Sequence, residues 1–321
     1  MSATRRALLA LPALATPALA QPAWPDRPVR VIVSFPGGST PDIAARAVSN
    51  HLAQAFRQPF VIDNRAGGGG TIGADATAKA TDGHTLGVTI GGPGSIAKIL
   101  NPQLPYDPVT ELVPVSLLAR MPFVLAVNPG VPVNDVAELV AYAKANPGKL
   151  NYGSVGAGST GHLVVAEMAA RLGMEMTHVP FRSVPQSVTE IVAGRIQLMA
   201  AAAGSVLGQV RAGQVRALGV SGDARMAQLP DVPMLAAQGE PAAGVYAWIG
   251  LFAPRGTPAD RLARLGLEAG RALSNPETGR ALEAAGFEPL GTPPAALATL
   301  IRDEVAHWGP IVRRLGIRPE S

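Results

Sequence analysis

The chain has 321 residues, of which 47% are hydrophobic and 16% are charged, and it contains no cysteine. This composition excludes a disordered chain and a disulfide framework, so its stability must come from a hydrophobic core. The length exceeds what one core normally holds, and we expect two domains. The formal net charge of +4 gives no reason to expect a nucleic-acid partner.

The first twenty residues predict a cleavable signal peptide. Arg5-Arg6 precede an apolar run, and Ala18-Leu19-Ala20 has the small-x-small pattern of a cleavage site. The run is too short to span a membrane, and the general secretory and twin-arginine export routes both stay open. Cleavage after Ala20 would remove two of the 27 basic residues and no acidic one, which leaves 25 basic and 23 acidic residues and a net charge of +2.

The first informative stretch is a glycine-rich turn between a predicted strand and a predicted helix. Residues 29–33 form an apolar, β-branched run typical of a buried strand. After the turn, apolar residues recur at helical spacing, namely Ile43, Ala44, Ala47, Val48, Leu52 and Phe56. We expect Thr40 to cap this helix, with Pro41 at its first position and Asp42 in its first turn. Such a turn presents unpaired N–H groups that favour an anion; the alternative is a capped turn that binds nothing.

The same unit of strand, glycine loop and helix recurs along the chain. Further strands are expected at residues 60–64, 84–90, 123–127, 150–155, 176–181, 195–201, 215–220 and 244–254. Glycine loops are expected at residues 65–70, 91–95 and 156–162. Helices are expected at 71–80, 258–273, 276–285 and 294–315; one more follows the third glycine loop and runs through Leu172, and another is capped by Asn134. This alternation predicts parallel α/β sheets, in which ligands bind at the carboxyl ends of the strands.

Motifs for catalysis are weak. Two segments match Gly-x-Gly-x-x-Gly, at residues 68–73 and 156–161, but no acidic residue ends the strand after the second, and Arg182 stands there instead. Ser159 and Ser205 lie beside glycines without a Gly-x-Ser-x-Gly motif, and the five histidines show no metal-ligand spacing. His162 has two possible roles, as a ligand contact or as a structural histidine, and Arg182 is either an anion clamp or a solvated charge. We expect no enzyme, no cofactor and no metal.

The glycine loops instead combine backbone donors with small hydroxyl groups. A small carboxylate, held by main-chain N–H groups and Ser/Thr hydroxyls between two α/β lobes, fits this inventory. Candidate contacts from the loops and the helix starts beside them are Thr71, Gly92, Ser95, Arg182 and Ser205.

A set of short motifs in a fixed order also resembles a known family. The motifs are Trp24-Pro25-x-Arg27-Pro28-Val29-Arg30, Pro36-Gly37-Gly38 with Asp42-Ile43-x-Ala45-Arg46, Val61-Ile62-Asp63-Asn64-Arg65, Gly69-Gly70-x-Ile72-Gly73-Ala74, Asp82-Gly83-x-Thr85-Leu86, Leu104-Pro105-Tyr106-Asp107-Pro108, Asn146-Pro147-Gly148-Lys149-Leu150-Asn151-Tyr152, His178-Val179-Pro180-Phe181, Leu229-Pro230-Asp231-Val232-Pro233 and Ala253-Pro254-x-Gly256-Thr257-Pro258. In this order, from residue 24 to the C-terminus, they resemble the Bug family, the periplasmic receptors of tripartite tricarboxylate transporters.

The resemblance implies a two-lobed periplasmic-binding-protein fold of type II, in which each lobe is a mixed, mostly parallel sheet flanked by helices. The expected division is a signal peptide at 1–20, lobe one at 21–121 and 223–321, and lobe two at 122–222. It also implies a monomeric periplasmic receptor that captures a di- or tricarboxylate-like ligand and delivers it to membrane permease subunits. Carried onto this chain, the ligand contacts are Phe35, Gly38, Ser39, Thr40, Asp42, Gly158, Ser159, Thr160 and His162. We expect Asp42 to order its turn rather than to hold the anion directly.

Two departures from the family pattern bear on the ligand. The first turn contains one residue more than the commoner Gly-Gly-x-x-Asp, and Ala200 to Ala203 stand where many relatives carry an aspartate. An ammonium group would lack a partner there, which favours a carboxylate without an amino group. Two other functions stay open: an exported enzyme (an esterase or an NADP-linked oxidoreductase), and a protein that presents its ligand to a sensor-kinase ectodomain.

Overall fold

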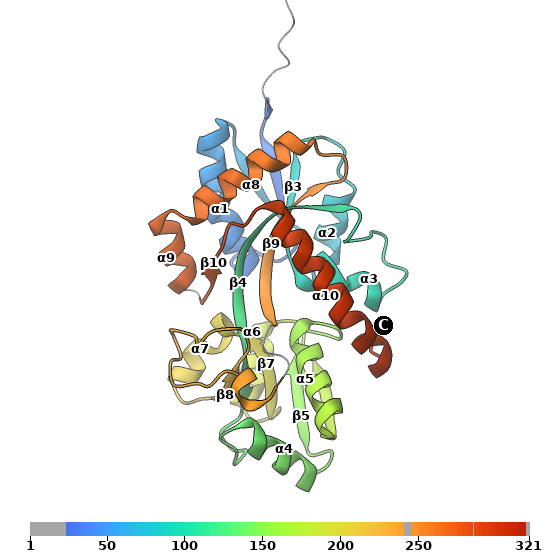
Figure 1. The fold of residues 1–321 in the computed structure, drawn as a ribbon, viewed down its shortest axis with the longest axis vertical. Coiled ribbons are helices and arrows are strands. Elements are labelled where there is room, and N and C mark those ends of the chain that lie inside the picture. The colour runs from blue at the N-terminus through green and yellow to red at the C-terminus, as the bar shows by residue number, and fades with distance from the viewer. Residues whose placement is uncertain (1–23, 241–244, 285, 319–321) are drawn as a thin grey trace, which may run out of the picture.

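The computed structural model describes residues 24–240, 245–284 and 286–318; the predicted signal peptide lies outside them. Two α/β lobes follow one another along the long axis of the molecule (Figure 1). The long strand β4 (Leu112–Val127) runs through the junction and belongs to both lobes, while β9 (Tyr246–Pro254) begins at the junction. No helix of the described residues is long and apolar enough to cross a membrane.

Lobe one is built on a sheet with the strand order β2-β1-β3-β9-β4. Its other strands are β1 (Val29–Val33), β2 (Phe60–Asn64), β3 (Thr85–Ile90) and β10 (Glu288–Pro289). Its helices are α1 (Thr40–Phe56), η1 (Gly68–Gly70), α2 (Thr71–Ala78), η2 (Gly92–Ile96), α3 (Ala97–Leu100), α8 (Ala259–Leu273), α9 (Pro276–Ala284) and α10 (Pro294–Leu315). Strands β1, β2 and β3 are parallel, β9 is antiparallel to β3, and β4 is antiparallel to β9.

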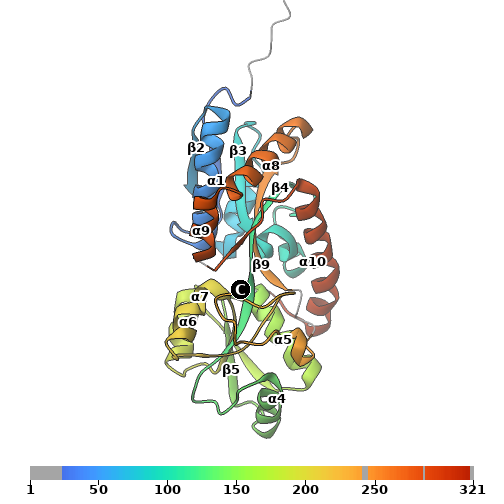
Figure 2. The same ribbon diagram turned by 60° about the vertical axis from the view of Figure 1, so that its left-hand side comes forward.

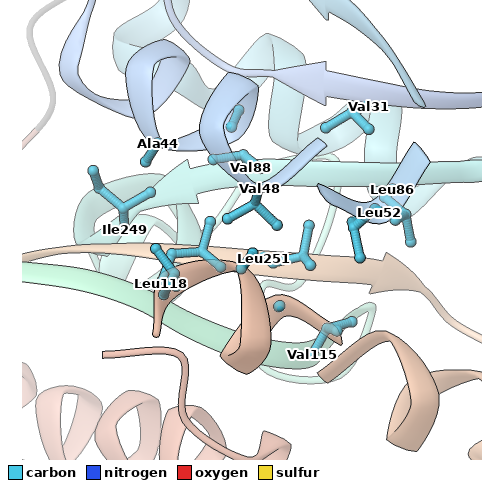
Figure 3. Close-up of a cluster of buried hydrophobic side chains, with 14 of the residues drawn as sticks. Val31, Ala44, Val48, Leu52, Leu86, Val88, Val115, Leu118, Ile249 and Leu251 are labelled. Carbon is cyan, nitrogen blue, oxygen red and sulfur yellow. The ribbon is translucent and has the colours of Figure 1, made fainter. Parts of the chain in front are cut away.

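The core of lobe one lies between this sheet and helices α1 and α8. The apolar stripe of α1 faces the strands, and Figure 3 shows Ala44, Val48 and Leu52 beside Val88, Leu118, Ile249 and Leu251. Four of the five residues of β1 are buried, as expected for a parallel strand covered on both faces.

Lobe two repeats the architecture around the last part of β4. Its other strands are β5 (Leu150–Ser154), β6 (Met176–Pro180), β7 (Leu198–Ala202) and β8 (Arg216–Val220), and its helices are α4 (Val136–Ala145), α5 (Thr160–Leu172), α6 (Val184–Val192), α7 (Ala203–Arg211) and η3 (Ala236–Gln238). Strands β5, β6 and β7 are parallel to one another, whereas β7 and β8 are both antiparallel to β4.

The direction of β4 determines where the loops of both lobes gather. Because β4 runs in the same direction as β1, β2 and β3, the carboxyl ends of these strands point toward lobe two. Because β7 is antiparallel to β4, the carboxyl ends of β5, β6 and β7 point toward lobe one. The loops that follow all six strands therefore face the junction from opposite sides.

Helix α10 makes a second connection between the lobes. Both ribbon views show it running along one side of the molecule toward α5 (Figures 1 and 2). Its residues Trp308, Ile311 and Val312 belong to the hydrophobic cluster of Tyr152 and Leu163 in lobe two. Near its end, Arg314 pairs with Glu167 of α5. The C-terminal helix of lobe one therefore packs on lobe two.

The chain after β8 stays in contact with lobe two before β9 begins. Met226 and Leu229 share a cluster with Val124, and the N–H of Leu235 donates to the Val220 carbonyl at 2.8 Å. The lobe boundaries at 121/122 and 222/223 remain predictions, and these contacts favour a second crossing closer to the start of β9.

Several predicted element limits are wrong. The N-cap of α1 is Ser39 rather than Thr40, and the N-cap of α4 is Asp135 rather than Asn134. Strand β4 begins at Leu112, well before residue 123, because its first part pairs with β9. The predicted loop at 91–95 is instead helical, a π-helical turn (η2) that continues into α3. The Tyr106 hydroxyl, which donates to the Pro93 carbonyl at 2.7 Å, stabilises that turn.

Candidate functional site

Among the helices that start at the junction without a side-chain cap are α1 and α5. The N-cap residues of α1 and α5 are Ser39 and Ser159, whose backbones have the extended conformation of a cap but whose hydroxyls make no capping hydrogen bond. The Ser159 hydroxyl donates instead to the Gly156 carbonyl at 2.9 Å, and the buried Ser39 hydroxyl has no partner among the described residues. By contrast, the side chain of Asp135 caps α4, away from the junction.

The uncapped ends leave backbone donors free on both sides of the junction. Among the described residues, no hydrogen-bond partner is found for the N–H groups of Thr40 and Asp42 in α1, or for those of Thr160, Gly161 and His162 in α5. The first N–H groups of a helix have no partner within it and carry the positive end of its dipole. Each helix start is therefore suited to an anion, and the two lie on opposite lobes.

Asp42 builds the turn that precedes α1. Its side chain accepts hydrogen bonds from Gly38 N at 2.9 Å, from Arg46 Nε at 2.8 Å and from Asn64 Nδ2 at 2.9 Å. Asn64 Nδ2 also donates to the carbonyl of Phe35 at 3.0 Å. Burial raises the pKa of Asp42, but the hydrogen bonds from Arg46, Gly38 and Asn64 outweigh it and hold this pKa below its ordinary value. The ionised carboxylate of Asp42 thus stabilises its own turn.

A stack of neutral rings supports the turn that precedes α5. Gly158 N donates to His162 Nδ1 at 2.8 Å, which leaves the ring proton on Nε2. The rings of His162 and His178 stack with their centroids 3.8 Å apart, and Tyr152 lies against both. Burial, together with the neighbouring His178, lowers the pKa of His162 to about 4, and burial also lowers the pKa of His178. Both imidazoles are therefore neutral near pH 7, and His162 adds no positive charge.

Glycines allow the turns to pack closely. A Cβ atom on Gly70 would lie 2.8 Å from Phe35 Cζ and 2.9 Å from Pro93 Cγ, so the loops after β1, β2 and β3 touch one another. A Cβ atom on Gly158, whose φ is +77°, would lie 2.3 Å from Leu100 Cδ1. Leu100 of lobe one therefore fills the space next to the α5 turn of lobe two.

Every residue predicted to contact the ligand follows a strand whose carboxyl end faces the junction. In lobe one, β1 is followed by Phe35, Gly38, Ser39, Thr40 and Asp42, β2 by Thr71, and β3 by Gly92 and Ser95. In lobe two, β5 is followed by Gly158, Ser159, Thr160 and His162, β6 by Arg182, and β7 by Ser205. The Thr71 hydroxyl donates to Gly68 O at 2.8 Å, and the Ser95 hydroxyl contacts Gly91 O and Glu304 Oε2. Contact of these residues with a ligand remains a prediction.

Sequence reasoning missed several residues that hold the site together. Asn64 links Asp42 to Phe35, and His178 stacks on His162 and contacts Ser154 Oγ at 2.7 Å. Since Tyr152 and His178 are partners in the register of β5 and β6, only the correct strand pairing would have revealed the stack. In the described parts of the chain, no group of three or more His, Asp or Glu residues is arranged to hold a metal.

Two lobes joined by hinge strands, with their loops facing one junction, define the class of periplasmic binding proteins, and solved structures confirm this predicted fold. The chain resembles a periplasmic transporter with a TM-score of 0.82 and 34% identity, covering 92% of this chain and 99% of that one. It resembles Rpa4515 of R. palustris, solved with adipate, with a TM-score of 0.83 and 32% identity (92% and 100% coverage). For MatC of Rhodopseudomonas palustris, solved with bound malate, the TM-score is 0.79 and the identity 33% (90% and 100% coverage).

Sequence comparison identifies the family. Residues 44–317 match the model of the tripartite tricarboxylate transporter family receptor, and the chain belongs to this family, which confirms the resemblance found in the sequence. It is 39% identical over 307 residues to the UPF0065 protein in the tcbD-tcbE intergenic region of Pseudomonas sp. strain P51, covering 95% of this chain and 91% of the relative. It is 33% identical to BugT of Bordetella pertussis, with 92% and 91% coverage.

Gly158→Ala tests the contact between the lobes. We expect it to lower the free energy of unfolding by about 2–5 kcal/mol, since a left-handed backbone costs about 1–2 kcal/mol and an overpacked Leu100 adds about 1–3 kcal/mol. Gly213→Ala is the matched control, because Gly213 has a φ of +67° and its Cβ would meet nothing within 4 Å. Urea unfolding measures both; equal losses would contradict the packing of Leu100 against Gly158.

The neutral imidazole of His162 predicts a loss of stability in acid. In the unfolded chain the imidazole of His162 binds a proton below its ordinary pKa. In the folded protein the same ring stays neutral until about pH 4. The free energy of unfolding therefore falls as the pH falls between these two values. Between about pH 6.5 and about pH 5 we expect His162 to account for a loss of about 2 kcal/mol. His162→Gln, which is neutral throughout, should lose that much less, while His307→Gln on the exposed side of α10 should behave as wild type. Urea unfolding at both pH values measures this; the same acid dependence in wild type and His162→Gln would refute the assignment.

Proposed function

We propose that this protein is a periplasmic solute-binding receptor that captures a small organic carboxylate between its lobes. The observation that carries the proposal is the pair of uncapped helix starts, α1 on lobe one and α5 on lobe two, which face one junction with free N–H groups. The ligand replaces water at these donors and draws the lobes together. Its binding energy comes from preorganised backbone dipoles rather than from a paired cationic side chain.

Two helix starts on opposite lobes favour a ligand with two anionic ends. Each start accommodates one negative group, so a dicarboxylate bridges the lobes where a monocarboxylate binds only one helix. The structures of Rpa4515 with adipate and MatC with malate support this ligand class. The end of β7 and the start of α7 carry the alanines Ala200, Ala201, Ala202 and Ala203, so this segment supplies no carboxylate for an amino group. We therefore favour a dicarboxylate without an ammonium group.

An enzymatic function is the alternative, and one contact at the site resembles a catalytic pair. Ser154 Oγ lies 2.7 Å from His178 Nε2, the spacing of a nucleophile and its base. Ser154 is 4% exposed, and its Oγ also lies 3.0 Å from Gly156 O and 3.2 Å from Gly156 N. Among the described residues, no carboxylate orients His178. The pair thus shapes the α5 turn, and we propose that the receptor performs no catalysis; ester turnover that Ser154→Ala abolishes would overturn this view.

Delivery to membrane permease subunits of a tripartite transporter completes the proposal. The family match and the predicted signal peptide at residues 1–20 support a periplasmic receptor that hands its ligand to a separate membrane protein. A sensor-kinase ectodomain is the second candidate partner, because it would recognise the same closed form. Crosslinking of the ligand-loaded protein to membrane partners, followed by their identification, distinguishes the two.

Removing a single backbone donor tests the binding mode. Thr160→Pro deletes the first N–H group of α5 at a position where proline is compatible with a helix. A hydrogen bond to a charged group contributes about 1.5–3 kcal/mol, so we expect affinity for adipate or L-malate to fall by roughly tenfold or more in isothermal titration calorimetry. Thr160→Ala separates the effect of the hydroxyl, and Ala259→Pro at the start of α8 is the matched control.

The same titration identifies the ligand class. Tight binding of L-aspartate or L-glutamate with none of dicarboxylates would refute the preference for a ligand without an amino group. Native mass spectrometry of the freshly purified protein should reveal a small acid that co-purifies with it. If Thr160→Pro and Ala259→Pro bind the ligand equally well, α5 does not hold it.

A further inference from the structure

Glu304 of α10 places its carboxyl group against β9 and η2. Its Oε1 accepts a hydrogen bond from Trp248 Nε1 of β9 at 2.8 Å, and its Oε2 lies 2.6 Å from Ser95 Oγ of η2. Trp248 is 2% exposed and Ser95 is 1% exposed. A Cβ atom on Gly91 would lie 3.4 Å from Oε2, so the backbone before η2 also covers the carboxyl group.

The two short contacts of the Ser95 hydroxyl are both satisfied when Glu304 carries a proton. Ser95 Oγ is within hydrogen-bond distance of two acceptors, the Gly91 carbonyl and Glu304 Oε2, but a hydroxyl has one proton to donate. If Glu304 were ionised, one of these contacts would join two oxygens without a hydrogen. If Oε2 is protonated, it donates to Ser95, Ser95 donates to Gly91, and every contact is satisfied.

The electrostatic surroundings agree with a protonated carboxyl. Burial raises the pKa of Glu304 to about 7, although hydrogen bonds from Ser95 and Trp248 oppose the rise. No described residue pairs a cation with Glu304: η2 has no charged residue, Lys98 of α3 donates to Leu104 O, and Arg120 of β4 pairs with Glu288 and Asp223. On α5, Glu167 pairs with Arg314, Arg171 pairs with Glu240, and His162 is neutral.

The charges on the remaining neighbours are also directed elsewhere. On α8, Glu268 pairs with His51 and Arg271, Arg261 and Arg264 lie over aromatic rings, and Asp260 is exposed. On β9, the hydroxyl of Tyr246 pairs with Asp223. On α10 itself, Arg302, Asp303, His307 and Arg313 are exposed.

The segment that Glu304 anchors touches the binding turns of both lobes. At its start, Pro93 of η2 packs against Gly70, which in turn packs against Phe35 of the α1 turn. At its end, Leu100 of α3 fills the space beside Gly158 of the α5 turn. Between these ends, Ile96 is buried in the cluster of lobe two. The position of residues 92–100 therefore bears on both helix starts at once.

We propose that the protonated carboxyl group of Glu304 is a positioning group for ligand binding, which holds residues 92–100 against β9 through its hydrogen bond to Ser95. The inference rests on the proposed function, because ligand affinity is its expected readout. Ionisation at alkaline pH removes the proton that the chain of hydrogen bonds needs. Residues 92–100 then loosen, and the two binding turns lose their common support.

Amide hydrogen exchange of the mature chain tests this mechanism without a ligand. We expect exchange of residues 92–100, corrected for intrinsic rates, to accelerate by roughly tenfold between about pH 6.5 and about pH 8.5 in wild type. Glu304→Gln keeps a donor and an acceptor in place at every pH and should remain protected. Asp303→Asn, on the exposed face of the same helix, is the matched control and should behave as wild type. Ser95→Ala, which removes the acceptor of the Glu304 proton, should expose the segment at both pH values.

Calorimetric titration with adipate and L-malate over the same pH range supplies the functional test. We expect wild-type affinity to fall by roughly tenfold toward the alkaline end, and that of Glu304→Gln to stay constant. Equal pH dependence of exchange or of affinity in wild type and Glu304→Gln overturns the role of Glu304. A third outcome separates the two proposals. If alkaline pH accelerates exchange in wild type but not in Glu304→Gln, and neither acid binds at any pH, Glu304 does position residues 92–100. The proposal of a dicarboxylate receptor is then refuted instead.

Discussion

The arrangement of the whole site depends on one strand that pairs with two sheets. Strand β4 pairs with β9 over its first part and with β7 and β8 over its last five residues. Had β5, β6 and β7 run in the same direction as β4, their carboxyl ends would face away from lobe one and the two sets of loops would lie at opposite ends of the molecule. The antiparallel pairing of β4 with β7 prevents this, so the helix starts that follow β1 and β5 both face the junction.

Given that arrangement, the side chains at the junction support the backbone donors and do not replace them. The Asp42 carboxylate is satisfied by Gly38, Arg46 and Asn64, and the Nδ1 of His162 is satisfied by Gly158. Both residues are buried, and each fixes the turn from which free N–H groups project. Backbone donors held in this way need no reorganisation when an anion arrives, which is how such a site gains affinity without a cationic side chain.

The sequence predicted the parts of this structure that are set by local patterns. Local patterns predict the apolar run of β1, the apolar stripe of α1 and the glycine turn between them. Apolar residues repeat with a different period in strands and in helices, and a few residues suffice to distinguish the two. The start of α1 was misplaced by one residue, since Ser39 and Thr40 are both acceptable caps and only the backbone distinguishes them. Residues 91–95 were expected to form a loop because Gly-Gly-Pro-Gly-Ser resembles one; Tyr106 and Glu304, distant in sequence, stabilise a helical turn there. No local pattern pairs Ser95 with Glu304 or His162 with His178, so these contacts became visible only with the fold.

The titration behaviour of these groups supports the proposed binding mode, in which main-chain dipoles hold the ligand. Near neutral pH, His162 and His178 are uncharged, and the negative charge of Asp42 is balanced by Arg46 within the same turn. Below its pKa of about 7, Glu304 is mostly protonated and likewise contributes no charge beside η2. In the proposed binding mode the positive ends of α1 and α5 then provide the electrostatic attraction, undiminished by a negative charge on Glu304. Gain of a proton by the histidines in acid, or its loss from Glu304 in alkali, places a bare charge in this buried region. The chemistry of the supporting groups thus favours ligand binding in the pH range in which His162, His178 and Glu304 stay neutral.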